Sequence, residues 1–287
     1  MGEALRLTPR PLGRTGISVS PLVLAGGAIF GANPENLKIT PEDVERAFYD
    51  HGINTFLVVP MMKPMAEGVR RLVKAEHRNE IVIVTEVSFP FGWWVRRDFE
   101  RISRSLGVET IDVFLLGWVR ARWHMTGNTW KTFVALRDEG KVRAIGFSCH
   151  DRVLATQLTR EFPVDTLMIR YNAAHRGAER EVFDPLGDSR PAIIGYTATR
   201  WGMLLKSLPT AGFDAPMTAG ECYRFALGHP SVDAVMCGAR SLQEIRENVE
   251  ATLNGPLDAA RLAEVRKFGD AVHANARGGF RWMFRGG

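Results

Sequence analysis

The sequence predicts an α/β fold, a (β/α)8 TIM barrel whose floor is closed by an N-terminal β-hairpin. Short apolar, β-branched runs alternate with longer segments of helical period, and eight such runs occur along the 287 residues. The runs are apolar on both faces and follow a strict strand-then-helix order, which indicates parallel strands joined by right-handed crossovers. The stretch "LAGGAIFGANPEN" after the first run lacks the G-x-G-x-x-G pattern of a doubly wound open sheet. We therefore expect a closed barrel that forms a single domain over residues 1–287.

The expected elements follow in order along the chain. "RLTPRPLGRTGISVSPL" has a Gly-Arg-Thr-Gly turn between alternating segments, which is typical of a hairpin. The expected strands are "LVLAGGA" from residue 22, "INTFLVV" from 53, "EIVIVTEV" from 80, "IDVFLLGW" from 111, "VRAIGFS" from 142, "TLMIRYN" from 166, "AIIGYT" from 192 and "VDAVMCGA" from 232. Thr40-Pro41-Glu42-Asp43 predicts a helix N-terminus, and further helices are expected to begin near Arg96, Thr129, Arg152, Ala178, Thr218 and Leu242. We interpret "MKPMAEG", from residue 62, as a solvated loop, and the alternative is that its Lys63 supplies a charge to the site.

The composition is that of a soluble globular protein, with 45% hydrophobic and 24% charged residues. No apolar run approaches the roughly 20 residues that span a bilayer, and the start "MGEALRLTPRPLG" has no apolar signal region, so we expect a cytoplasmic protein without a membrane partner. The net charge is +5, but the basic residues are spread along the chain, which does not indicate nucleic-acid binding. The three cysteines are far apart, so neither a disulfide framework nor a metal site is expected.

In such barrels the reactive side chains lie at the C-terminal ends of the strands, where the loops begin. Glu86 ends the third run among apolar neighbours, which predicts a raised pKa and makes it a candidate general acid or base. The alternative is a structural ion pair with Arg170 or Arg120. His150, directly after "GFSC", is a candidate proton donor near physiological pH, and its alternative is a helix-start residue beside Asp151.

Aromatic residues gather in the loops that follow the third and fourth runs. Such residues are typical of the walls of an apolar pocket for a bulky ligand, although core packing explains some of them. Basic residues in the second of these loops indicate an anionic substrate, or else a surface loop with scattered charge. The expected substrate pocket comprises Trp93, Trp118, Arg120 and His124, with Trp94 and Trp123 nearby.

Six segments occur in an order and at spacings that resemble the landmarks of the aldo-keto reductase superfamily: "RPLGRTGISVSPLVLAGG", "GINTF", "EGKVRAIGFS", "YNAAHRGAEREVF", "IIGYTATRWGMLL" and "GARSLQEIRENVEA". The resemblance covers nearly the whole chain. It implies a barrel that binds NADPH without a Rossmann motif and reduces carbonyls by hydride transfer. It also implies that the C-terminal segment, residues 270–287 with Phe280, Trp282 and Phe284, folds over the substrate pocket.

The resemblance fails at the residues that would do the chemistry. The family's catalytic set is an Asp that ends strand two, a Tyr five residues later, a Lys that ends strand three and a His that ends strand four. Carried over by position, these four places hold Leu57, Met62, Glu86 and Gly117. A missing general acid lowers a rate by roughly 10²- to 10⁴-fold, so we expect ordinary aldehyde reduction to be feeble or absent.

The cofactor half of the family pattern is better kept. Arg240 and Ser241 open a predicted helix and make a site for the ribose 2′-phosphate of NADP(H), to which the backbone N–H groups and the helix dipole contribute. Tyr196 takes the place of the ring that stacks on the nicotinamide, whereas Met168 replaces a Gln that contacts the carboxamide. The resemblance implies cofactor binding by Ser148, Tyr196, Arg200, Gly238, Arg240, Ser241, Glu244 and Asn248.

Three hypotheses for the function follow. The first is a noncanonical NADP-dependent oxidoreductase acting on a bulky apolar or anionic small molecule. The second is a pseudoenzyme that binds NADP(H) or a metabolite and acts by contacting a protein partner. The third is a cofactor-independent lyase or isomerase that uses Glu86 and His150 as its acid and base.

Overall fold

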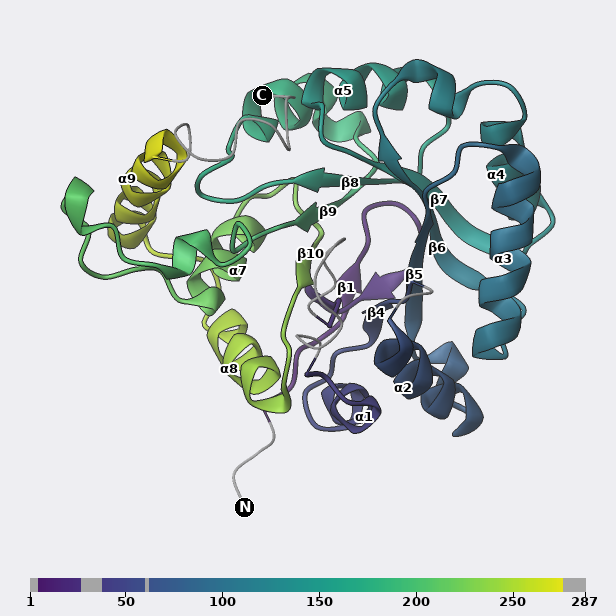
Figure 1. The fold of residues 1–287 in the computed structure, drawn as a ribbon, viewed down its shortest axis with the longest axis horizontal. Helices are drawn as coiled ribbons and strands as arrows, with labels where there is room; N and C mark the ends of the chain where they lie inside the picture. Colours follow the sequence, from purple (N-terminus) through teal and green to yellow (C-terminus); the bar gives the residue numbers. More distant parts are fainter. Residues whose placement is uncertain (1–4, 27–37, 60–61, 276–287) are drawn as a thin grey trace.

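Eight parallel strands form a barrel that closes on itself. The computed structural model describes residues 5–26, 38–59 and 62–275. The strands are hydrogen-bonded in the order β10-β3-β4-β5-β6-β7-β8-β9, and β10 pairs back to β3 (Figure 1). Each strand coincides with one of the eight apolar runs, so the predicted closed barrel is confirmed. The bounds are β3 Leu22–Leu24, β4 Thr55–Leu57, β5 Val82–Val87, β6 Ile111–Val119, β7 Val142–Cys149, β8 Thr166–Arg170, β9 Ala192–Tyr196 and β10 Ala234–Cys237.

Helices cover the outside of this barrel (Figure 1). The expected helix starts after Thr40 and Thr218 are confirmed, because each side chain accepts a hydrogen bond from the N–H three residues later and completes a capping box. The bounds are α1 Pro41–Tyr49, α2 Lys63–Lys74, α3 Gly92–Leu106, α4 Asn128–Asp138, α5 Arg152–Glu161, α6 Asp184–Leu186, α7 Ala219–Leu227, α8 Leu242–Leu253 and α9 Ala259–Asn275, with a π-helical turn at Glu179–Phe183.

Three helices differ from the sequence prediction. α2 occupies the segment that we interpreted as a solvated loop, because Pro64 suits its first turn and Met65 begins a buried stripe along one face. α9 was not predicted, although its buried residues, including Phe268, recur at helical spacing. α3 begins at Gly92, before the expected start near Arg96. Residues 280, 282 and 284, which were expected over the pocket, lie outside the described residues.

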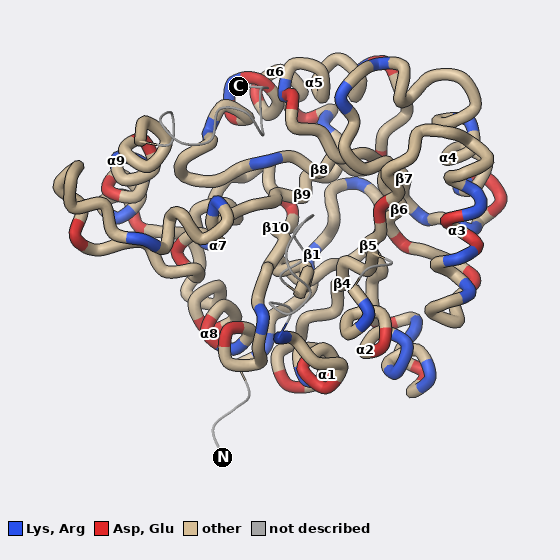
Figure 2. The backbone as a smooth tube through the Cα atoms, viewed as in Figure 1, with Lys and Arg blue, Asp and Glu red and all other residues tan. Residues whose placement is uncertain are grey.

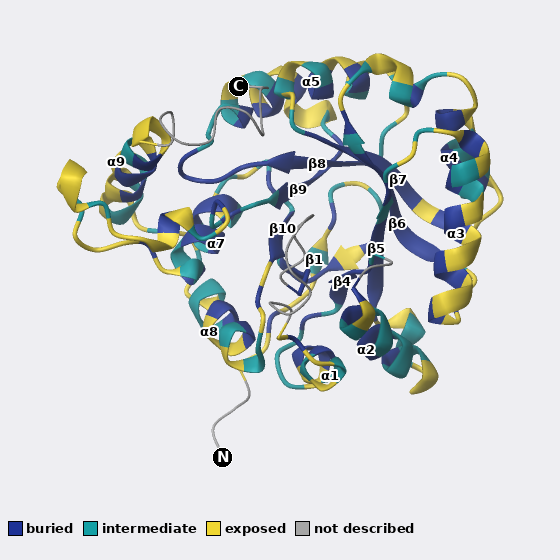
Figure 3. Ribbon diagram, in the orientation of Figure 1, coloured by how far each residue is buried: buried dark blue, intermediate teal, exposed yellow. Residues whose placement is uncertain are grey.

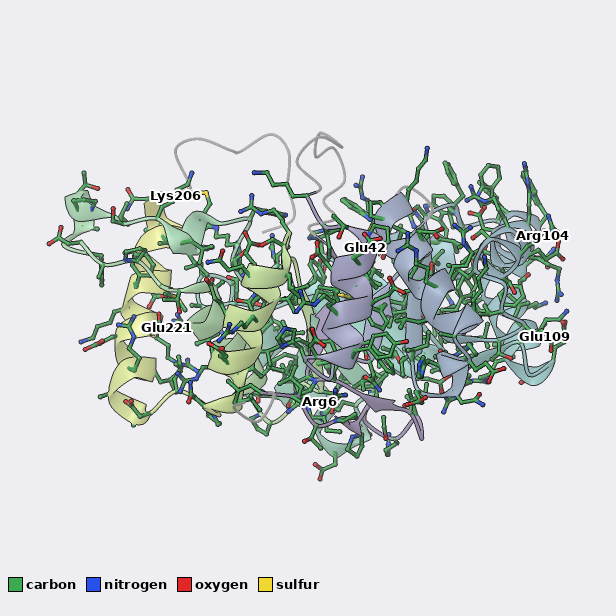
Figure 4. The ribbon with its side chains drawn as sticks, turned by 90° about the horizontal axis from the view of Figure 1, so that it is seen from below. Arg6, Glu42, Arg104, Glu109, Lys206 and Glu221 are labelled. Atoms are coloured by element: carbon green, nitrogen blue, oxygen red, sulfur yellow. The ribbon has the colours of Figure 1, made fainter. Side chains whose placement is uncertain are left out.

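The N-terminal hairpin closes one end of the barrel, as predicted. Its strands, β1 Arg10–Pro11 and β2 Ser18–Val19, pair antiparallel, and hairpin residues such as Leu12 are buried among the inward-facing residues of the barrel. Gly13 approaches the floor so closely that an added Cβ would lie 3.0 Å from the Cα of Ala192. Figure 4 shows the hairpin at the lower end of the molecule near Arg6, and Lys206, in the loop after β9, near the upper end. The C-terminal ends of the strands are therefore left for a site.

A second apolar cluster fills the space between strands and helices. It includes Phe56, Phe114 and Phe133, each without measurable solvent exposure. Figure 3 shows the barrel strands mostly buried and the helices buried on the sides that face them. Acidic and basic residues are interspersed along the outer helices rather than separated by sign (Figure 2). Within the described ranges, no helix has the length and apolar character needed to cross a membrane.

Candidate functional site

Side chains of the strands line the inside of the barrel at its C-terminal end. Strand residues alternate between the two faces, and in β5, β6, β8 and β9 the residue two positions before the one named below belongs to the cluster that fills the barrel interior, as Leu57 of β4 does itself. The alternation brings together residues that the sequence named from separate strands. The inward-facing residues at this end, which we call the inner ring, are Leu57 of β4, Glu86 of β5, Gly117 of β6, Ser148 of β7, Arg170 of β8 and Tyr196 of β9.

The β4 side of this ring offers no proton donor. Leu57 is 9% exposed and belongs to the barrel-interior cluster. Met62 is 3% exposed and precedes α2, and its Cε lies 3.1 Å from where a Cβ on Gly26 would stand. Thioether and alkyl groups cannot give up a proton, so an acid for this site must come from another strand.

Glu86 lies directly over Gly117. A Cβ built on Gly117 would stand 3.2 Å from both the carboxyl carbon and Oε2 of Glu86. That separation is tighter than ordinary van der Waals contact, so any larger residue at position 117 would push the carboxyl group aside. The absence of a side chain at 117 therefore makes room for the carboxyl group, and the two replacements fit each other.

The Glu86 carboxyl group is held in a poorly solvated place. Oε2 reaches no solvent and has no hydrogen-bond partner. Burial raises the pKa of Glu86 to about 7, and hydrogen bonding by Trp118 and Ser148 opposes that rise only in part. Among the described residues, Glu86 forms no ion pair with Arg170 or Arg120. The structure therefore does not support the alternative that Glu86 is held in a structural ion pair.

A β-bulge shapes the wall next to Glu86. The register of β6 with β7 shifts between Leu116 and Val119, and Trp118 adopts a left-handed backbone with φ 61°. Its N–H donates to Ser148 Oγ at 2.8 Å. A bulky residue seldom adopts this conformation, and such strain tends to occur at functional sites.

The other non-glycine residues with positive φ follow the same trend. Of the five among the described residues, Thr197, Arg200 and Trp201 lie in the loop after β9, at the same end of the barrel as Trp118. Glu76 is the exception. The strained backbone therefore gathers at the C-terminal ends of the strands, where a site is expected.

His150 lies beside the ring but is not charged at neutral pH. Its ring centroid lies 5.5 Å from that of Trp118 and 5.4 Å from that of Tyr196. Burial, followed by the charges of Arg170 and Arg120, lowers the pKa of His150 to about 4. A neutral imidazole can donate or accept a hydrogen bond, but an imidazolium acid is present only well below neutral pH. Near neutral pH, Glu86 is therefore a better candidate for the proton donor than His150.

Tyr196 and Cys149 keep their protons. The Tyr196 hydroxyl donates to the backbone carbonyl of Cys149 at 3.2 Å, and burial raises the pKa of the phenol. The Cys149 thiol donates to the carbonyls of Val119 and Asp151, both at 3.1 Å, and burial raises its pKa to about 12. Neither group is suited to act as a nucleophile or base at neutral pH.

The expected phosphate site lies between β10 and α8. Ser241 caps α8, with its side chain accepting from Glu244 N at 3.3 Å. Gly238 and Arg240 are exposed, and the Arg240 guanidinium pairs with Glu244 at 2.9 Å. An exposed arginine at a helix N-terminus suits a phosphate group, provided that the guanidinium exchanges its carboxylate partner for the ligand.

Two residues expected at the cofactor are turned elsewhere. Asn248 is 4% exposed, and its amide donates to Cys237 Sγ at 3.6 Å. Arg200 is 7% exposed and donates to the carbonyl of Val272 in α9 at 2.8 Å. In this arrangement neither presents its polar group to a ligand at the phosphate site.

The aromatic loops after β5 and β6 are more open than the ring. Trp93 is 64% exposed and Trp123 is 57% exposed. Trp123 packs against His124, with ring centroids 4.2 Å apart, and the exposed Arg120 lies over the Trp118 ring at 5.6 Å. Trp118, which is partly buried beside Glu86, is thus the aromatic residue that the structure brings nearest to the candidate acid.

Sequence reasoning underrated Arg170. It was considered only as a partner of Glu86, yet it is 7% exposed and stands on the inner ring. The alternation of side chains along the strand "TLMIRYN" could have identified it. Met168 is expected in the site, and Arg170, two residues later, lies on the same face of the strand.

Glu86 should make stability depend on pH. Since its folded pKa is about 7 and the unfolded value is near 4.5, the folded state holds the extra proton between these limits and loses stability as pH rises through them. We expect the free energy of unfolding of the parent, relative to that of Glu86→Gln, to fall by about 2 kcal/mol from pH 5 to pH 8. Urea unfolding across this range measures it. Glu109→Gln, at an exposed position, should run parallel to the parent, and a Glu86→Gln curve that also runs parallel would contradict the assignment.

Comparison with known proteins gives a consistent result. The model of the Aldo/keto reductase family matches residues 24–212. No curated protein matches the chain. The holo form of aldo-keto reductase AKR11C1 from Bacillus halodurans is similar with a TM-score of 0.74 and 19% identity, over 92% of this chain and 96% of that one. A Pseudomonas aeruginosa protein assigned to the aldo-keto reductases has a TM-score of 0.66 and 23% identity, over 87% of this chain and 97% of its own. At these identities the two likenesses establish the fold alone.

Proposed function

Since the chain belongs to the aldo/keto reductase family, we propose that it is an NADP(H)-dependent oxidoreductase whose proton donor is the Glu86 carboxyl group. The substrate is a bulky small molecule with a reducible carbonyl or enone group. The observation that carries this proposal is the fit of the Glu86 carboxyl group over Gly117 on the inner ring. It places an acid in the site, whereas the apolar Leu57 and Met62 stand where the family has its catalytic Asp and Tyr.

Glu86 suits the role of acid because its proton is retained at neutral pH. A general acid works best when its pKa lies near the working pH, and burial brings the pKa of Glu86 to about 7. When bound, NADPH would supply the hydride that adds to the carbonyl carbon or to the β-carbon of an enone. Glu86 holds a proton at its carboxyl group and gives it to the substrate oxygen, which carries the electron pair released from the C=O bond. Water then returns a proton to the carboxylate.

Two parts of the chain would hold the cofactor. Arg240 and the N-terminus of α8 suit its 2′-phosphate, since the guanidinium is exposed and the first helix turn presents N–H groups that have no partner within the helix. Tyr196 stands on the inner ring in register with Arg170 of β8 and suits the nicotinamide end. Met168 offers no hydrogen bond where the family has a Gln, so the nicotinamide end is held less firmly than the phosphate end.

Two measurements on the purified protein test this proposal. Quenching of tryptophan fluorescence during titration should show NADPH binding more tightly than NADH, and mixing with a panel of aromatic aldehydes and enones should consume NADPH. Binding without any consumption of NADPH would favour a pseudoenzyme instead. If neither nucleotide bound, the cofactor-independent hypothesis would replace the proposal, and loss of that activity in Glu86→Gln would support it.

A further inference from the structure

Arg170 stands out among the buried arginines of the described residues. It is 7% exposed, and its Nε reaches neither solvent nor a hydrogen-bond acceptor. Arg200 is equally buried but donates to the carbonyl of Val272, and Arg152 pairs with Glu181 at 2.5 Å. No ion pair or hydrogen bond from the Arg170 guanidinium occurs within residues 5–26, 38–59 and 62–275. A largely buried charge without a protein partner is costly, so the guanidinium is available to a ligand that the protein alone does not supply.

The groups around Arg170 do not neutralise it. On β9 its neighbour in register is Tyr196, whose phenol stays protonated. Burial, followed by the charges of Arg170 and Arg120, lowers the pKa of His150 and keeps it neutral. The charge of Arg152 also acts on Arg170, and Arg152 itself pairs with Glu181. Burial lowers the pKa of Arg170, yet an arginine stays charged at any working pH. The ring therefore carries a net positive potential on its β8 side.

The strand order sets Arg170 across the ring from the acid. β5 and β8 are separated by β6 and β7 in the closed barrel, so Glu86 and Arg170 approach the mouth from facing sides. No ion pair joins them, as described above. A ligand that lies between them would meet a proton donor on one side and an unpaired guanidinium on the other. Trp118 and Tyr196 would border it.

We propose that Arg170 binds a carboxylate group of the substrate and thereby turns the reducible carbonyl of that substrate toward Glu86. This inference rests on the proposed function for the identity of the site, and it names the substrate class as carbonyl or enone compounds that also bear a carboxylate. A planar guanidinium matches a carboxylate with two parallel N–H···O bonds, which gives both affinity and orientation.

The test compares binding of 4-formylbenzoate and its uncharged methyl ester in the presence of NADP⁺, so that no reduction occurs. Isothermal titration calorimetry of the parent should show the carboxylate binding at least ~10-fold more tightly than the ester. Arg170→Gln should weaken binding of the carboxylate by ~10- to 100-fold and that of the ester by less than ~3-fold. Equal affinity of the parent for the two compounds would overturn the proposal.

Two further variants separate this role from others. Arg120→Gln should leave most of the carboxylate preference, and if it removed the preference instead, the exposed arginine would be the anion site. If Arg170→Gln weakened NADP⁺ and the carboxylate alike, Arg170 would belong to the cofactor site and the proposal would fail. Because binding is read without turnover, failure of Glu86 as the acid leaves this result unaffected.

Stability gives an independent readout that a merely structural arginine would not produce. Arg170→Met keeps an unbranched apolar stem and removes a largely buried charge that has no partner among the described residues, so the thermal midpoint of the unliganded protein should rise while carboxylate binding is lost. A fall in the midpoint would show that the guanidinium stabilises the fold, and would overturn the proposal. Arg152→Met breaks a partly buried ion pair with Glu181 and should lower the midpoint.

Discussion

Replacing Glu86 with Gln should lower kcat for NADPH-dependent reduction by roughly 10²- to 10⁴-fold. The amide has the shape of the carboxyl group and can donate a hydrogen bond, but it has no proton to give at working pH. The space over Gly117 that holds the carboxyl group also admits the amide, so the loss should appear in kcat while the affinity for NADPH stays within about 3-fold of the parent. Stopped-flow measurement of NADPH oxidation, together with a fluorescence titration, separates the two.

Glu109→Gln is the matched control, since it makes the same chemical change at an exposed position that precedes β6, away from the inner ring. It should retain the full rate. If Glu86→Gln also retained the rate, the proton would have to come from another group, and His150 would be the next residue to replace. An equal loss of cofactor affinity would instead show that Glu86 supports the binding of NADPH.

Replacing Arg240 with Ala should weaken NADPH binding by roughly 10- to 100-fold, because the variant loses the charge-assisted hydrogen bonds to the 2′-phosphate. NADH lacks that phosphate, so its affinity should change by less than about 3-fold and the preference for NADPH should collapse. Titration of each variant with both nucleotides measures this.

Arg246→Ala provides the matched control. Arg246 of α8 pairs with Glu250 four residues later, as Arg240, just before α8, pairs with Glu244, and both arginines are exposed. The control therefore removes the same kind of surface ion pair away from the helix N-terminus. If the two variants lost affinity equally, the effect would reflect the overall charge of α8, and the phosphate site would have to lie elsewhere.

The barrel was readable from the sequence because each of its strands is buried on both faces. Eight β-branched runs, a hairpin turn and capped helices such as the one after Thr40 all indicated the same architecture. The prediction of a loop in place of α2 was wrong because Lys63, Pro64 and Met65 were interpreted as loop residues. Proline is in fact favoured in the first turn of a helix. α9 was not expected because it follows the last of the eight predicted strand–helix units.

The site could be predicted only in part, because its properties depend on distances between strands. The sequence identified Glu86 and Gly117 as replacements at separate strand ends, but their mutual fit is a contact between β5 and β6. It also could not show that the polar ends of Asn248 and Arg200 are engaged by Cys237 and Val272. That the Arg170 Nε lacks a hydrogen-bond partner among the described residues likewise depends on where the surrounding side chains lie, which the sequence does not give.

The pH dependence of the reductive step tests the role of Glu86 most directly. In single-turnover reactions with saturating NADPH, the rate should be constant at low pH and fall tenfold per pH unit above an apparent pKa of about 7, the value that burial sets for Glu86. The residual rate of Glu86→Gln should not vary with pH across this range. A parent rate that stayed level from pH 5 to pH 9, or a Glu86→Gln variant that kept the same fall near pH 7, would contradict the assignment of the proton to this carboxyl group.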